Sequence, residues 1–177
     1  MHWTIVFIDE SGFYLVNGRI RTYSPKGARP VLKVFQSRDH LSVLCALTDQ
    51  GKIYTRTHDK SLTSQEVVLF LRHLLRYLVG PVLVIWDRGG IHRGDVEAFL
   101  ATRAGRRIQV ERLPAYAPEL NPCEWVWEHL KDTELRGVCC LNIRQLKWRL
   151  HQAIMRLRTK PHLLLAFFAG AGLPLDS

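Results

Sequence analysis

The chain has 177 residues, a hydrophobic fraction of 47% and a charged fraction of 23%, which is an ordinary composition for one globular domain. Its 25 lysines and arginines outnumber its 16 acidic residues, and the resulting net charge of +9 favours a polyanionic partner such as nucleic acid. The four cysteines include no C-x-x-C pair, and the N-terminus lacks the pattern of a signal peptide. The longest uncharged apolar run is far too short to span a membrane, so we expect a soluble, intracellular protein.

The first third of the chain predicts antiparallel β-structure. Residues 3–9 form an apolar run that ends in Asp9, as in a buried central strand with an acid at its carboxyl end. Gly12 permits a turn, after which residues 13–18 and 19–23 predict a hairpin closed by an Asn-Gly dipeptide. On this interpretation the first strand ends at Asp9.

A second hairpin and a helix follow. Residues 41–47 and 52–57 predict two strands joined by a short turn. Thr63 and Glu66 then have the spacing of a capping box, and an apolar stripe at helical spacing continues toward Gly80, where a Gly-Pro pair ends the helix.

The next segment alternates strands with helices. Residues 82–87 form a second apolar strand, which ends in Asp87, and a helix over 95–103 and a strand over 107–113 come after it. This succession predicts parallel strands joined by crossover connections.

The stretch from Leu113 to Trp127 combines a proline-rich loop with an abrupt helix start. Its three prolines exclude a regular helix or a central strand in the loop, whereas Asn121 is a good N-cap and Pro122 suits the first helical position. Glu124 then falls in the first turn. Two interpretations are open: Glu124 is a carboxylate presented at a rigidly defined point, or it is the partner of Asn121 in a capping box.

The C-terminal third predicts two helices. Asn142 caps the first, whose inward residues run from Ile143 to Leu157, and residues 162–168 form the second. Five basic residues lie off the apolar stripe of the first helix: Arg144, Lys147, Arg149, Arg156 and Arg158. Such a face can contact DNA, but a charged outer face is usually only solvated, and we favour the second interpretation.

Asp9 and Asp87 each end an apolar strand, and reacting groups gather at the carboxyl ends of strands in such sheets. If the two strands are neighbours, the carboxylates repel one another unless a cation lies between them. Glu124 can complete an all-oxygen site of the kind that suits Mg²⁺ or Mn²⁺, and two such ions support in-line displacement at a phosphodiester. Glu119 and Glu128 are rivals of Glu124 that the spacing leaves open.

Three segments resemble the catalytic blocks of DDE transposases, in the bacterial insertion-sequence branch of the mariner-type superfamily. They are Phe-Ile-Asp-Glu-Ser-Gly-Phe at 7–13, the segment 84–93 around Asp87, and Leu-Pro-x-Tyr-x-Pro-Glu-Leu-Asn-Pro-x-Glu-x-x-Trp at 113–127. The spacing between Asp87 and Glu124 is also close to that of the superfamily.

The resemblance implies an α/β chain with an RNase H-like fold, which is a five-stranded mixed sheet, with its first three strands antiparallel, flanked by helices. It implies one catalytic domain over 1–177, with 141–177 as a helical C-terminal extension. Members of the family also have an N-terminal helix-turn-helix domain, which is absent from this sequence. We therefore expect a fragment, a separately encoded catalytic half or a degenerate copy.

The resemblance also implies roles for residues. Asp9, Asp87 and Glu124 would be the catalytic residues and the ligands of two Mg²⁺ or Mn²⁺ ions, which would drive nicking at transposon ends and attack of the freed 3′ hydroxyl on target DNA. Supporting roles fall to four further residues: Arg88, His92, Tyr116 and Asn121. Arg88 departs from the small or polar residue that is common in the family, and it would either contact the scissile phosphate or pair with Asp87.

The implied partners are double-stranded DNA, as transposon ends and as target, a second copy in a homodimer, and a separate N-terminal DNA-binding half. No membrane is expected, and the implied location is the bacterial cytoplasm, in association with the nucleoid. Two alternatives remain open: a nuclease of the same fold that hydrolyses DNA without strand transfer, and a non-catalytic DNA-binding remnant of a transposase.

Overall fold

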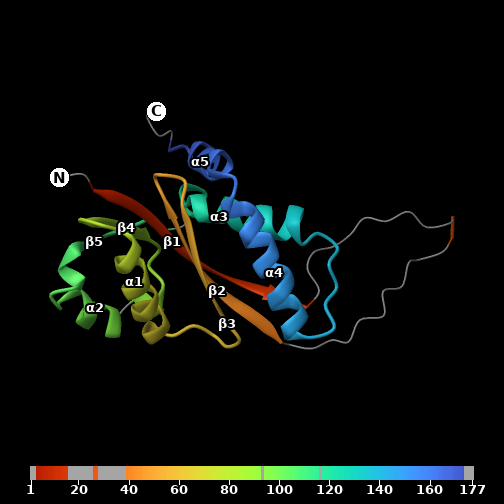
Figure 1. Ribbon diagram of the computed structural model, residues 1–177, viewed down its shortest axis with the longest axis horizontal. Coiled ribbons are helices and arrows are strands. Elements are labelled where there is room, and N and C mark those ends of the chain that lie inside the picture. The colour runs from red at the N-terminus through yellow and green to blue at the C-terminus, as the bar shows by residue number, and fades with distance from the viewer. Residues whose placement is uncertain (1–2, 16–25, 28–38, 93, 116, 174–177) are drawn as a thin grey trace.

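The computed structural model describes residues 3–15, 26–27, 39–92, 94–115 and 117–173. Within them, five strands form one mixed sheet in the order β3-β2-β1-β4-β5, and helices cover both of its faces (Figure 1). The predicted α/β class, with a five-stranded sheet flanked by helices, is confirmed.

One half of the sheet is antiparallel. β1 (Thr4–Tyr14) pairs with β2 (His40–Thr48), and β2 pairs with β3 (Ile53–His58). In the turn between β2 and β3, the Gly51 N–H donates to the Thr48 carbonyl at 3.0 Å. Gly51 has a φ of 68°, a conformation that strains any residue with a side chain. The predicted second hairpin is therefore confirmed.

β1 is longer than the sequence pattern predicts. Asp9 lies in the middle of the strand rather than at its end, and Gly12 continues the ladder opposite Ser42 instead of turning the chain. The prediction was wrong here because β2 supplies pairing partners as far as Tyr14, and a glycine without a side chain can stay extended when its backbone is paired. Most of the predicted hairpin over 13–23 lies outside the described residues.

The other half of the sheet is parallel. β4 (Val82–Trp86) pairs with β1, and β5 (Ile108–Arg112) pairs with β4. Helix α1 (Ser64–Tyr77) connects β3 to β4, and α2 (Asp95–Leu100) connects β4 to β5. The predicted crossover connections are confirmed, although α2 ends before residue 103.

Both ends of α1 are fixed by side chains. At the start, the Glu66 carboxylate accepts a hydrogen bond from the Thr63 N–H at 2.9 Å, as the capping-box pattern predicts. At the end, the guanidinium of Arg107 donates to the carbonyls of Leu75 at 3.1 Å and Gly80 at 2.9 Å. Carbonyls in the last turn of a helix lack partners within the helix, so Arg107 satisfies that of Leu75. Its bond to Gly80, in the loop after the helix, also ties this end of α1 to the start of β5.

Three helices follow the sheet in the chain: α3 (Pro122–Glu128), α4 (Ile143–Arg158) and α5 (Pro161–Gly170). The shorter helical segments are η1 (Gly90–His92), η2 (Gly105–Arg107), η3 (Pro118–Leu120) and the π-helical turn η4 (His129–Glu134), which continues α3. The side chain of Asn142 accepts from the Gln145 N–H at 2.9 Å, which confirms it as the N-cap of α4.

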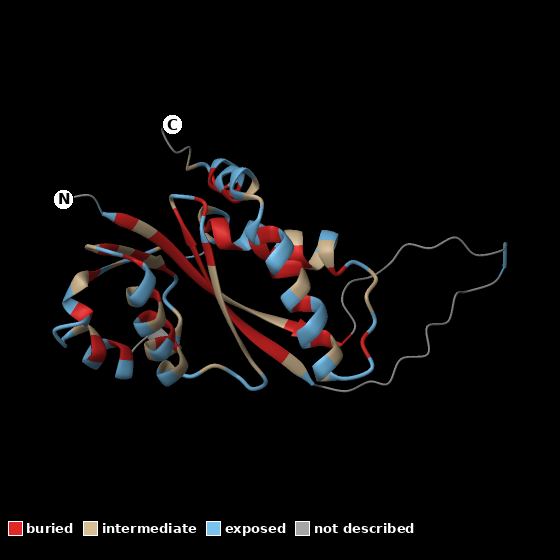
Figure 2. Ribbon diagram, viewed as in Figure 1, coloured by how far each residue is buried: buried red, intermediate tan, exposed pale blue. Residues whose placement is uncertain are grey.

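The core consists of two apolar layers, one on each face of the sheet, and Figure 2 shows that the buried residues follow the strands and the inner sides of the helices. In β1, Val6 and Ile8 pack with α1 and α2, whereas Phe7 and Phe13 pack with α3, α4 and α5. Because α4 and α5 belong to the second layer, the C-terminal helices share a core with the sheet.

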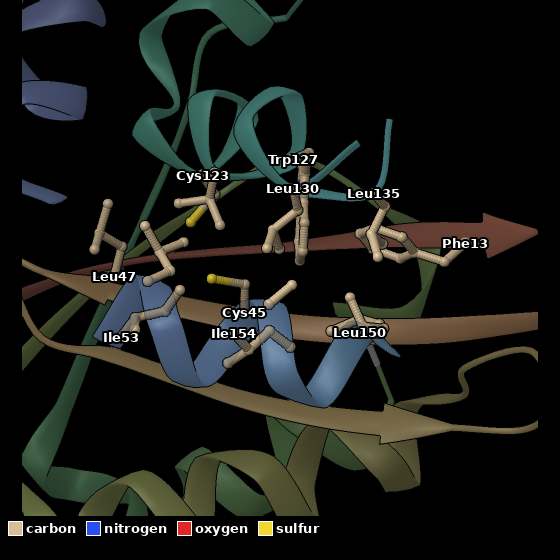
Figure 3. Packing of buried hydrophobic residues seen from close by; sticks show 14 of the residues in the cluster. Phe13, Cys45, Leu47, Ile53, Cys123, Trp127, Leu130, Leu135, Leu150 and Ile154 are labelled. Atoms are coloured by element: carbon tan, nitrogen blue, oxygen red, sulfur yellow. The ribbon is translucent and has the colours of Figure 1, made fainter. Parts of the chain in front are cut away.

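The second layer also contains thiols. Figure 3 shows Cys45 of β2 directed toward Cys123 of α3, with Ile154 of α4 on the other side of Cys45. Both cysteines are free and fully buried, and the Cys123 thiol donates to the Phe7 carbonyl at 3.3 Å. These two cysteines therefore serve as apolar packing groups between sheet and helices.

None of the helices in the described part of the chain has the length and apolarity that crossing a membrane requires.

Candidate active site

Asp9 and Asp87 are neighbours because β1 and β4 run parallel. The last pair of their ladder is Phe7 with Ile85, so two residues farther along each strand Asp9 comes level with Asp87. β4 has ended by then, and the Asp87 carboxylate accepts a hydrogen bond from the Gly89 N–H at 2.8 Å. Asp87 thus belongs to a tight turn after β4, whereas Asp9 is held inside β1.

Asp9 is the buried member of the pair, with 9% of its surface exposed. Its Oδ2 accepts a hydrogen bond from the indole N–H of Trp127 at 2.7 Å. Burial raises the pKa of Asp9 from 3.8 to about 7; the hydrogen bond from Trp127 opposes this rise, and the negative charges of Glu124 and Glu10 add to it. Near neutral pH, Asp9 therefore keeps its proton part of the time unless a cation favours the charged form.

The start of α3 presents Glu124, whose side chain is exposed. Asn121 caps the helix by accepting a hydrogen bond from the Cys123 N–H at 3.1 Å. The backbone N–H of Asn121, which a capping-box glutamate would engage, donates to the Pro118 carbonyl at 2.8 Å. The geometry therefore favours presentation of Glu124 over its use as a cap.

Asp9, Asp87 and Glu124 line one cleft of about 440 Å³. The other lining residues come from the turn after β4, the proline-rich loop and the N-cap of α3: Arg88, Gly89, Leu113, Pro114, Ala115, Ala117, Pro118 and Asn121. Three elements that are far apart in the sequence thus bring three carboxylates and one guanidinium to the same hollow.

Glu119 and Glu128 occupy a different position. They line a neighbouring hollow of about 460 Å³, which also includes Glu124, Trp127 and Lys131. Neither is among the described residues that line the cleft of the two aspartates. Position therefore favours Glu124 over both rivals as the third carboxylate.

The donor set of the cleft suits a hard divalent cation. Carboxylate oxygens are the ligands that Mg²⁺ and Mn²⁺ prefer, and a cation beside Asp9 would offset the cost of ionising a buried acid. The described residues include no group of three His, Cys, Asp or Glu side chains that is close enough to hold a metal as it stands. Asp87 and Glu124 are both exposed, whereas Asp9 is buried.

The structure describes some of the remaining predicted residues and not others. Arg88 lines the cleft and Asn121 caps α3. The backbone of His92 belongs to η1, but its side chain, like the whole of Tyr116, is outside the described part of the chain. The sequence interpretation gave no role to Trp127, although the third block contains it; its place one turn after Glu124 was the available signal.

The sequence over residues 4–147 matches the family model of the DDE superfamily endonucleases. No curated protein matches the chain.

Solved structures of Mos1 transposase have a similar fold. The Mos1 strand transfer complex aligns with a TM-score of 0.66 at 20% identity, over 95% of this chain and 54% of that chain. The Mos1 mariner paired end complex with Mn gives 0.63 at 17% identity, over 98% and 56%. The catalytic domain of Mos1 mariner transposase gives 0.51 at 16% identity, over 97% and 84%.

This chain spans about half the length of the chains in the two Mos1 complexes. At such identities the likeness shows the fold, and it confirms the predicted RNase H-like architecture. The predicted bacterial insertion-sequence branch stays a prediction.

Proposed function

Because the chain belongs to the DDE superfamily of endonucleases, we propose that it is the catalytic domain of a transposase, which cleaves DNA strands at transposon ends and joins the freed 3′ hydroxyl to target DNA. The observation that supports this proposal is the cleft lined by Asp9, Asp87 and Glu124. Carboxylates gathered in this way bind the divalent ions on which phosphodiester displacement depends.

The charged and polar residues in and beside the cleft have four roles in this proposal. Asp9, Asp87 and Glu124 would hold two Mg²⁺ or Mn²⁺ ions, which would supply activation of the attacking oxygen and stabilisation of the leaving oxygen. Trp127 orients the Asp9 carboxylate through its indole N–H. Asn121 fixes the helix start from which Glu124 projects. Arg88 lines the same cleft, which supports contact with the scissile phosphate as its role, with pairing to Asp87 as the alternative.

DNA is the proposed partner. A net charge of +9 favours a polyanion, and the similar Mos1 structures are a strand transfer complex and a paired end complex. A homodimer and a separate N-terminal DNA-binding half are further proposals that rest on the family alone. Placement in the bacterial cytoplasm, near the nucleoid, likewise remains a prediction.

Cleavage of a labelled duplex oligonucleotide with Mg²⁺ or Mn²⁺ tests the assignment. Asp87→Asn and Glu124→Gln should each lower the cleavage rate by on the order of 10³-fold or more, because each removes a metal ligand. Glu128→Gln is the matched control, since it makes the same change one helical turn beyond Glu124 and should leave the rate unchanged. Equal rates in all four proteins would overturn the catalytic assignment.

Strand transfer needs its own assay. With ends that are already cut, the protein should join the 3′ hydroxyl to a target plasmid, and the same two substitutions should abolish joining. Cleavage without joining would instead identify a nuclease of the same fold, and binding without either reaction would identify a DNA-binding remnant.

A further inference from the structure

A second and larger hollow, of about 1200 Å³, lies along β3 at the edge of the sheet. β3 contributes its residues from Ile53 to Thr57, and α1 and α4 form the two sides; in the view of Figure 1, β3 runs between these two helices. None of its lining residues lines the cleft of Asp9. We call this hollow the β3 groove.

The β3 groove is strongly positive. Five cationic residues line it: Lys52, Arg56, Arg144, Lys147 and Arg158. No aspartate or glutamate is among its lining residues in the described part of the chain. Lys147 pairs with the exposed Asp59 at 3.0 Å, and Arg158 donates to the neutral hydroxyl of Thr55 at 3.5 Å. The groove therefore has several more cations than counter-charges.

His73 lines the groove from α1 and lies in the field of these cations. Its pKa is lowered first by burial and then by the positive charges of Arg56, Arg76 and Arg158. All three charged groups that act on His73 are thus arginines, and a bound anion is what would offset them.

Aromatic rings accompany the cations. Tyr77 and Trp148 line the groove with 60% and 56% of their surfaces exposed. The Tyr77 ring lies 5.9 Å from that of Tyr54 on β3, which holds it beside the strand. Cations interleaved with exposed aromatic faces suit a polynucleotide, since phosphates meet the cations while sugars or bases rest on the rings.

We propose that the β3 groove binds a segment of DNA outside the catalytic cleft, through its phosphodiester backbone. The choice of DNA among polyanions rests on the proposed function. Arg144 and Arg158 begin and end the α4 wall, about 21 Å apart along the helix. That distance matches about six steps of a DNA helix at 3.4 Å per step.

The positive charge of the groove argues against two other ligands that an edge strand can bind, a peptide and a second copy of this chain. A peptide added to β3 would use the strand's backbone groups but, if neutral, would leave the cations without counter-charge. A second copy of this chain, with a net charge of +9, would bring two positive surfaces together. The sequence predicts that all five basic residues on the outer face of α4 are only solvated. The structure instead shows that Arg144, Lys147 and Arg158 line the groove, whereas Arg149 and Arg156 do not.

Binding to labelled oligonucleotides, measured by fluorescence anisotropy in EDTA, tests the groove without any cleavage. The variant Arg144→Gln/Arg158→Gln removes two exposed cations of the groove. Arg103→Gln/Arg106→Gln is the matched control, because it makes the same charge change at exposed positions near β5, at the opposite edge of the sheet. The groove variant should bind at least on the order of tenfold more weakly than the control.

Salt dependence and a third variant show whether the groove binds duplex DNA or a single strand. For a duplex, loss of two phosphate contacts should reduce the slope of log K against log salt by about 1.8, and for a single strand by about 1.4. Trp148→Ala should weaken a single strand by about tenfold, through lost stacking, and leave a duplex nearly unchanged. Lys52→Gln, which removes one exposed cation of the groove, should weaken the binding of DNA by a smaller factor than the double variant does.

Equal affinities of the groove variant and the control would overturn the proposal. So would a groove variant with unchanged DNA affinity but altered oligomeric state on size exclusion, because the groove would then be an interface between copies. Binding measured in EDTA does not require the cleft to hold a metal, so binding through the groove is measured separately from cleavage. Failure to cleave DNA, with groove-dependent binding intact, would therefore count against the proposed function and leave the groove standing.

Discussion

The indole N–H of Trp127 donates a hydrogen bond to the Asp9 carboxylate at 2.7 Å, and both side chains are buried. This bond joins α3 to the central strand of the sheet. It orients the first carboxylate of the cleft and lowers a pKa that burial raises.

Trp127→Phe should keep the apolar packing and remove this bond. The pKa of Asp9 should rise further, so the acidic limb of the cleavage profile should shift to higher pH. The free energy of unfolding at pH 8 should fall by about 1–3 kcal/mol, because a buried acceptor loses its donor. Trp125→Phe, at a partly exposed position of the same helix, is the control; a cleavage profile that Trp127→Phe leaves in place would contradict the assigned bond.

Asp9→Asn should make the metal-free protein less sensitive to pH. The folded-state pKa of Asp9 is raised from 3.8 to about 7, so its contribution to stability is fully present below about pH 4 and is lost as the pH rises through 7. The variant should therefore gain stability relative to wild type between pH 4 and pH 8, by at most roughly 4 kcal/mol. Urea unfolding in EDTA at several pH values measures the difference.

The exposed Glu97 of α2 provides the control for this titration, because Glu97→Gln should show no comparable gain between pH 4 and pH 8. Addition of Mg²⁺ at pH 8 should raise the free energy of unfolding of the wild type, because the cation offsets the charge of the Asp9 carboxylate. The same addition should change that of Asp9→Asn little, because the asparagine carries no charge. A stability difference that stays flat across this range would mean that Asp9 is not buried as described.

Asn121→Ala should impair cleavage more than it impairs folding. Loss of the N-cap costs about 1 kcal/mol of stability, whereas displacement of Glu124 by about 1 Å can lower a rate by about 10²-fold. Asn121→Asp should preserve both properties, because aspartate accepts the same bond from the Cys123 N–H. Parallel cleavage assays and thermal melts separate the two effects, and a rate loss no larger than the stability loss predicts would argue against a positioning role.

Arg107→Met should destabilise the fold without a specific effect on the cleft. It removes the guanidinium that donates to the carbonyls of Leu75 and Gly80, at a cost of about 2–3 kcal/mol in the free energy of unfolding. Arg107→Lys should recover only part of this, because an ammonium lacks the planar fork. Arg106→Met, at an exposed neighbouring position, should be nearly neutral in the same urea titration.

Local signals in the sequence were reliable where the structure is local. The capping box at Thr63, the N-caps at Asn121 and Asn142, and the turn at Gly51 all depend on residues within four positions of one another. The extent of β1 was predicted wrongly because Gly12 is paired with Ser42, and no window around Gly12 contains its partner.

In the candidate site, too, the sequence predicts local features but not contacts between distant residues. Residue types and spacing suggested Asp9 and Asp87 but left Glu124 beside its rivals Glu119 and Glu128, and the family resemblance selected Glu124 among them. The structure brings Asp9, Asp87 and Glu124 to one cleft. The bond between Trp127 and Asp9 joins residues more than a hundred positions apart, so the sequence gives no measure of it. The β3 groove was missed for a similar reason, since its cations come from β3, the turn before it and α4, and only the fold brings them together.

Helix α3 acts on the cleft in two ways: it presents the Glu124 carboxylate, and one turn later its Trp127 indole holds the carboxylate of Asp9. A small slide or tilt of this single seven-residue helix would therefore misplace one proposed ligand and release another together. The metal site should accordingly assemble in a single cooperative step. A substitution that disturbs the packing of α3 should abolish metal binding as a whole and should not leave a site with part of its ligands in place.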